Sequence, residues 1–182
     1  MVNQTQAAAV EKKVLKLLRK CEKLEKYDFD LHLVNGYGID IEPQADRYVG
    51  LAIEVENTET HWPDDAPYPP SWRKGFTVPS RKQKFYISHP LSLYVKVNSN
   101  LTRAVVAPMA FICAHIPVHN NNREERNFKD NRFFMIKDPE HPAICYCSIE
   151  DLPKVVASQL DNLYRIGNTS KKFTGDRPIF NR

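Results

Sequence analysis

The chain has 182 residues, 42% of them hydrophobic and 26% charged, which is ordinary for a soluble globular protein and excludes a disordered or fibrous chain. No apolar run is as long as a membrane span and the first residues lack the apolar core of a signal peptide, so we expect a cytoplasmic protein. The four cysteines are scattered, which favours reduced thiols, and a net charge of +4 permits a polyanionic partner.

The N-terminal segment predicts an amphipathic helix of about five turns with a basic outer face, because apolar residues recur at helical spacing from Val10 to Leu24 with lysines among them. Three strands are expected next, over residues 28–34, 39–42 and 47–57. Between the first two, Asn35-Gly36 is a tight-turn signal.

Residues 58–79 hold five prolines and both tryptophans without periodicity, and a loop this long is usually functional or mobile. A basic segment at residues 81–86 is expected to form one or two helical turns. Strands over 91–97 and 102–107 form a predicted hairpin. A polar loop (117–132), two short strands (133–137 and 143–147) and a second amphipathic helix (149–166) complete the predicted elements.

Three carboxylates near the third strand indicate a cation site. Asp40 lies in a Gly-bounded turn, and Glu54 and Glu56 share one face of a strand because side chains alternate along it. Such an oxygen-rich site suits Mg²⁺, which needs one or two carboxylates and completes its shell with water and phosphate oxygens. The alternative is that Asp40 is a turn residue and the two glutamates are the solvated face of an edge strand.

This arrangement resembles the PD-(D/E)xK nuclease superfamily, with Asp40 in the first acidic position and Glu54-Val55-Glu56 in the place of the (D/E)xK tripeptide. The expected order of helix, three strands, basic helix and strand is similar to the αβββαβ core of that superfamily over about residues 6–107. The resemblance implies an α/β (α+β), restriction-endonuclease-like fold with a mixed central sheet flanked by helices. Residues 108–166 would add strands and a helix to this single domain, and 167–182 a basic tail.

The resemblance also implies the ligands of a metal ion. Asp40 and Glu54 would bind Mg²⁺, with Mn²⁺ as a substitute, and the Val55 carbonyl would be the third ligand. Glu56 stands where the motif usually has a lysine, as it does in some restriction enzymes, and would orient or deprotonate the attacking water.

In some members of the superfamily a basic residue reaches the site from a neighbouring helix, and here Lys82 would do so. In some members an acidic residue from the preceding helix completes the metal site, and Glu11 is the candidate for that residue here. We therefore expect Asp40, Glu54, Glu56 and Lys82 to be the catalytic residues.

The predicted activity is Mg²⁺-dependent hydrolysis of DNA by an endonuclease of phage, mobile-element, repair or restriction type, acting as a homodimer. Phosphate contacts supply most of the non-specific affinity for DNA. The residues expected to contact it are Arg73, Lys74, Arg81, Lys84 and Trp72. The alternative is that these charges are only solvated and that the tryptophans anchor the Pro-rich loop to the core.

Two other functions remain open at this stage. A catalytically lapsed PD-(D/E)xK-like module would bind nucleic acid or a protein, and Glu56 in the lysine position favours it. An interaction protein would use the acidic strand only as surface. Metal binding that depends on Asp40 distinguishes the nuclease from both.

Overall fold

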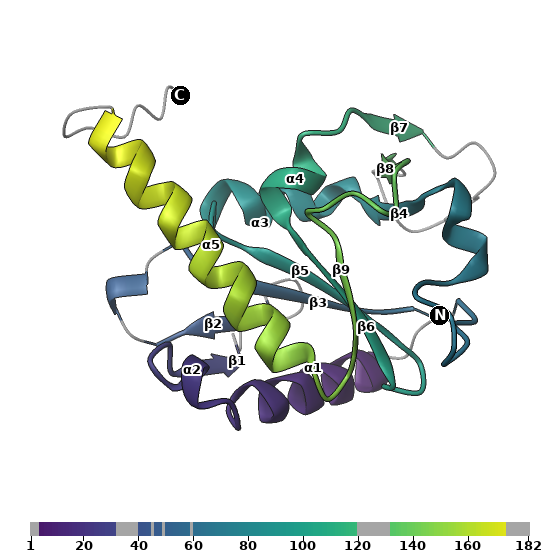
Figure 1. The fold of residues 1–182 in the computed structure, drawn as a ribbon, viewed down its shortest axis with the longest axis horizontal. Helices are drawn as coiled ribbons and strands as arrows, with labels where there is room; N and C mark the ends of the chain where they lie inside the picture. Colours follow the sequence, from purple (N-terminus) through teal and green to yellow (C-terminus); the bar gives the residue numbers. More distant parts are fainter. Residues whose placement is uncertain are drawn as a thin grey trace.

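A six-stranded mixed sheet forms the centre of the molecule, with long helices packed against it (Figure 1). The structure is a computed structural model that describes residues 4–31, 40–44, 46–48, 50–58, 60–119 and 132–173. The predicted turn at Asn35-Gly36 and the last part of the basic tail lie outside these residues. No helix in the described ranges is long and apolar enough to cross a membrane.

The predicted N-terminal helix is present, in two pieces. Helix α1 covers Gln4–Leu18 and the single turn α2 covers Glu22–Glu25. Cys21 between them has an extended backbone, so the chain bends there. The apolar face is buried as its spacing predicts, with Val10, Val14 and Leu18 in the core.

The central sheet confirms the predicted mixed α/β architecture. Its order is β1-β2-β3-β5-β6-β9, and its only parallel neighbours among the described strands are β3 and β5. The strands are β1 (Phe29–Leu31), β2 (Ile41–Pro43), β3 (Ile53–Thr58), β5 (Leu93–Asn98), β6 (Arg103–Pro108) and β9 (Cys145–Ser148). The predicted hairpin corresponds to β5 and β6, and the second amphipathic helix to α5 (Leu152–Phe173).

Several predicted bounds were wrong. The third strand begins at Ile53 instead of residue 47, because Asp46–Tyr48 form a 3-10 turn, η1, and Gly50 takes a positive φ of 83°. The expected loop over 58–79 contains a 3-10 turn, η2 (Pro70–Lys74), and strand β4 (Phe76–Pro79).

A second, three-stranded sheet lies beside the central one at the upper right of Figure 1. Its order is β4-β8-β7, with β8 at Arg132–Ile136 as predicted. Strand β7 (Pro117–His119) was not predicted, because its residues were assigned to a polar loop. Helix α4 (Met109–Cys113) was not predicted either.

The two faces of the central sheet are buried in different hydrophobic clusters. On one face Ile53, Val55 and Val95 pack with residues of α1 and α5. On the other, Tyr94 packs with residues of the Pro/Trp connection, β4, β8 and α4. Burial on both faces explains why β5 is almost uninterruptedly apolar. A polar side chain on these strands is therefore placed inside the protein.

The connection from β3 to β5 brings the predicted basic segment back against the sheet. After β4 the chain forms a 3-10 turn, η3 (Ser80–Lys82), and then helix α3 (Gln83–Ser88), so the expected helical turns are confirmed. Parallel strands require such a crossover. The crossover places η3 next to β8 and α3 next to α4.

Gly75, between η2 and β4, provides a test of this packing. Its φ of 104° is unfavourable for other residues, and an added Cβ would lie 2.3 Å from the carbonyl oxygen of Ile136. We expect Gly75→Ala to lower the free energy of unfolding in urea by about 2 kcal/mol or more. Gly50→Ala is the control: its φ is also positive but its Cβ meets only the Pro90 ring at 3.3 Å, so the loss should be about 1 kcal/mol. Equal losses would contradict this account.

Candidate active site

Asp40 directly precedes strand β2, where β2 pairs with strand β3. The register joins Ile41 to Ile53. Two residues further along β3, the Val55 N–H donates to Asp40 Oδ2 at 2.6 Å. Because buried backbone N–H groups need an acceptor, this bond places the Asp40 carboxylate beside the acidic strand.

Glu54 is a buried carboxylate in the middle of the sheet. Its side chain is 1% exposed, and its Oε1 forms an ion pair with Lys82, which is 15% exposed and comes from η3. Its Oε2 has no hydrogen-bond partner among the described residues. A buried charge is stable only when it is paired, so the return of the crossover to β3 compensates Glu54.

The charges of these groups are coupled. Burial raises the pKa of Asp40 to about 7, Lys82 opposes this shift, and Glu11 of α1 adds to it. Burial likewise lowers the pKa of Lys82, while the negative charges of Asp40 and Glu11 oppose that shift. Groups from α1, the start of β2, β3 and η3 therefore share one electrostatic environment.

A second ion pair lies two residues further along β3. Glu56 is opposite Lys96 in the parallel register, and its Oε1 is 3.0 Å from Lys96 Nζ. Its Oε2 accepts a hydrogen bond of 2.8 Å from the hydroxyl of Tyr94. Burial, followed by the charge of Glu56, raises the pKa of Tyr94 well above its ordinary value. Each glutamate of the acidic strand thus has its own lysine.

The structure brings together three of the four predicted catalytic residues. Asp40 binds the backbone of β3 next to Glu54, and Lys82 contacts Glu54. Glu56 is on the same strand but has both oxygens engaged. Of Val55, the expected third ligand, the structure shows the N–H bound to Asp40, and its carbonyl as a ligand stays a prediction.

Sequence reasoning missed Tyr94 and Lys96. A signal for them exists, because both are polar or amphipathic residues in the apolar run Leu93–Asn98. Their partner is on the neighbouring strand, however, and the register that joins Lys96 to Glu56 cannot be read from one sequence.

The residues predicted to contact DNA divide into two groups. Arg73, Lys74 and Lys84 are exposed, and Arg81 is half-buried. The prediction for Trp72 was wrong, because its side chain is only 6% exposed and stacks on Phe76 with ring centroids 4.8 Å apart. Trp72 anchors the Pro-rich connection to the core and is not available to stack on a base.

The donor set suits a small hard cation that keeps much of its own water. Within the described ranges, no three His, Cys, Asp or Glu side chains are grouped closely enough to hold an ion by themselves. Mg²⁺ needs only one or two carboxylates. The buried and unpartnered Oε2 of Glu54, together with the neighbouring Asp40, offers these ligands.

No family model, no curated protein and no solved structure matches this chain. A relationship to the PD-(D/E)xK superfamily therefore stays a prediction from the sequence. What the site does is inferred from its own geometry and from the order of the elements around it.

The raised pKa of Asp40 makes stability depend on pH. In the native protein this carboxyl keeps its proton up to about pH 7, whereas an ordinary carboxyl loses it near 3.8, so the native state binds more protons in between. The free energy of unfolding should therefore fall as pH rises from about 4 to about 7. Asp40→Asn, which keeps the acceptor for Val55 N–H, should remove on the order of 1–3 kcal/mol of this fall. The measurement is urea unfolding in EDTA across this range, and parallel curves for the two proteins would refute the assignment.

The Glu54–Lys82 pair predicts a non-additive pair of substitutions. Lys82→Met leaves a buried carboxylate without its counter-charge, which should cost about 3–5 kcal/mol of unfolding free energy at pH 8. Adding Glu54→Gln should recover most of that loss, because the buried group is then neutral. Lys74→Met removes the same charge from an exposed position in η2 and should change stability by about 0.5 kcal/mol or less. A similar loss for both single variants would show that the pair does not matter.

Proposed function

We propose that this protein is a Mg²⁺-dependent DNA endonuclease with a PD-(D/E)xK-type core. The observation that carries the proposal is the meeting of Asp40, Glu54 and Lys82, which come from three separate segments of the chain. Two carboxylates and a lysine in one buried site are the groups that a metal-assisted phosphodiester hydrolase needs. Burial raises the pKa of Asp40 and lowers the pKa of Lys82, and shifted pKa values are common at catalytic sites.

The order of the elements supports the same proposal. The chain runs from α1 through the antiparallel strands β1, β2 and β3, then through α3 to β5, which is parallel to β3. This is the order of the αβββαβ core that the sequence predicts. We therefore propose the restriction-endonuclease-like fold as the finer description of the mixed α/β architecture.

In the proposed reaction Asp40 and Glu54 would hold the metal ion. When bound, Mg²⁺ would lower the pKa of a water molecule and offset negative charge on the phosphodiester. Lys82 would take the part of the motif lysine, because it contacts Glu54 although it is far from Glu54 in the sequence. Because burial lowers its pKa, Lys82 is suited to orient the attacking water and to exchange a proton with it.

Glu56 has a supporting part in this scheme. Its two oxygens are held by Lys96 and Tyr94, so it could act on the water only after one of these bonds opened. We assign water activation to Lys82 for this reason. The substrate is DNA, with Arg73, Lys74 and Lys84 as exposed phosphate contacts, and cleavage of both strands would need two copies of the chain.

Two isosteric substitutions test the proposal. Purified protein should cut plasmid DNA with Mg²⁺ or Mn²⁺, and Asp40→Asn or Glu54→Gln should reduce the rate on the order of 100-fold or more, because each removes a charged metal ligand. Asp65→Asn removes a carboxylate from the exposed connection and should leave the rate unchanged. Circular dichroism should show that each variant is folded.

Calorimetric titration with Mn²⁺ separates the endonuclease from its alternatives. The wild-type protein should bind the ion. Asp40→Asn should bind it about tenfold or more weakly, which is the usual loss of metal affinity when a group that holds the ion is changed. If the wild type neither cuts DNA nor binds the ion through Asp40, the endonuclease proposal is wrong. DNA binding without either property would indicate a lapsed binding module.

A further inference from the structure

The positive charge of the protein is concentrated in its first helical segment. Residues 4–26 contain seven Lys and Arg side chains and three Glu, a net charge of +4 that equals the formal net charge of the whole chain. The other residues of the chain therefore balance to zero. Such an asymmetry points to a particular anionic partner of α1 and not to general solubility.

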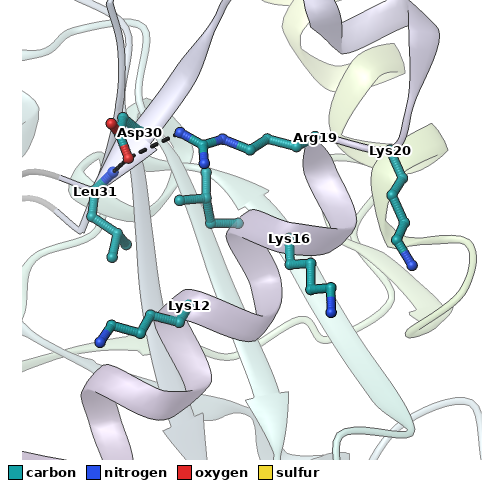
Figure 2. A pocket seen from close by; sticks show the side chains of 7 residues that line it. Lys12, Lys16, Arg19, Lys20, Asp30 and Leu31 are labelled. Atoms are coloured by element: carbon teal, nitrogen blue, oxygen red, sulfur yellow. Dashed lines mark hydrogen bonds and ion pairs between the residues drawn. The ribbon is translucent and has the colours of Figure 1, made fainter.

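Five lysines of this segment form an exposed surface, here named the basic stripe. Its residues are Lys12, Lys13, Lys16, Lys20 and Lys23. Figure 2 shows Lys12, Lys16 and Lys20, at positions four residues apart, among the side chains that line a hollow. This hollow of about 450 Å³ lies between these lysines and strand β1.

The basic stripe has no counter-charge in the part of the chain that the structure describes. No ion pair joins any of its five lysines to an acidic residue there. Arg19, in the same hollow, is different, because it forms an ion pair of 3.0 Å with Asp30 (Figure 2). Arg19 also donates to the Phe29 carbonyl at 2.8 Å. Arg19 therefore fastens α1 to β1, whereas the lysines are left to face solvent.

This arrangement is unfavourable for the isolated helix. Like charges three or four residues apart repel one another, and Lys12, Lys16 and Lys20 form two such steps. A helix that needed only a solvated face would alternate lysine with glutamate, yet Glu11 is the one acidic side chain of α1. The repulsion is relieved when a polyanion lies along the stripe.

The basic stripe begins beside a residue that acts electrostatically on the candidate site. Glu11 precedes Lys12 in α1, and its negative charge acts on both Asp40 and Lys82. From Lys12 the stripe continues past the end of α1 at Leu18 to Lys20 and to Lys23 of α2.

We propose that the basic stripe of the α1–α2 segment binds the phosphate backbone of duplex DNA. Lysines recognise phosphates as point charges without reading sequence. Proteins that bind single strands add aromatic side chains on which bases stack, and the stripe and its hollow contain none. The stripe therefore fits a duplex backbone. This inference rests on the proposed function and deepens it by naming the duplex form of the DNA and a surface that binds it.

The test measures binding without cleavage. Fluorescence anisotropy in EDTA follows a labelled DNA duplex of about 30 base pairs with the wild-type full chain and with the triple variant Lys12→Gln, Lys16→Gln, Lys20→Gln. The triple variant should bind roughly tenfold or more weakly, and the slope of log affinity against log salt should decrease by about three, one for each lost phosphate contact. Its thermal stability should be unchanged or slightly higher, because the substituted side chains are exposed and repel one another.

A matched triple variant controls for total charge. Arg47→Gln, Lys137→Gln and Lys154→Gln remove the same number of positive charges from exposed positions outside residues 4–26. The control should keep most of the affinity and of the salt slope. Equal losses in the two triple variants would overturn the proposal, as would wild-type binding that is tighter for a single strand of the same length or for anionic vesicles.

The outcome is separable from that of the proposed function. Asp40→Asn should bind the duplex as well as the wild type in EDTA, since it leaves the stripe intact. If the stripe variant loses duplex binding but the wild type never cuts DNA, the stripe proposal stands and the endonuclease proposal is wrong. If the stripe variant still binds and cuts the duplex, the stripe proposal is wrong and the endonuclease proposal stands.

Discussion

The buried charge of Glu54 is the constraint on which the rest of the structure depends. A carboxylate at the centre of a sheet loses its hydration and is tolerated only when a cation reaches it. The lysine that does so belongs to the crossover between β3 and β5, not to either strand. The crossover must therefore return to the sheet at η3, and β4, which pairs with β8, fixes where this return occurs.

Alternation along β3 converts that constraint into a site. Ile53 and Val55 face the core formed with α1 and α5, while the two glutamates face the other side. Each glutamate obtains its counter-charge differently, one from the crossover and one from the neighbouring strand. The start of β2 adds Asp40, because the carboxylate of Asp40 accepts the hydrogen bond of the Val55 N–H and is thereby held against β3. The contacts that complete the sheet therefore also bring together the groups of the candidate site.

Much of the fold was predictable from local patterns. The apolar spacing of α1 and α5 and the alternation in β3 are period signals, and the structure confirms them at Val10, Val14 and Val55. The bounds of β3 were not predictable, since Leu51 and Ala52 look like strand residues and only the positive φ of Gly50 shows where the strand begins. Strand β7 was missed because its pairing with β8 is non-local.

The candidate site shows the same division. Asp40, Glu54 and Lys82 were identified from residue type and order, and the structure brings them together. Trp72 was misassigned because an aromatic residue among charges looks the same in sequence whether it points outward or inward. Lys96 was missed because its relation to Glu56 depends on the register of two parallel strands. Composition and order predict which groups exist, whereas tertiary packing decides which of them meet.

The parallel pairing of β3 with β5 has a consequence for how the protein folds. Antiparallel neighbours such as β5 and β6 are joined by a short turn, so little chain entropy is lost when they meet. Strands β3 and β5 are separated by the whole crossover, and non-local contacts of this kind form slowly. The Glu56–Lys96 ion pair spans that interval, and the Glu54–Lys82 ion pair joins β3 to the crossover itself. We therefore expect the carboxylates of β3 to remain hydrated until late in folding, so that the step that completes the sheet also assembles the site.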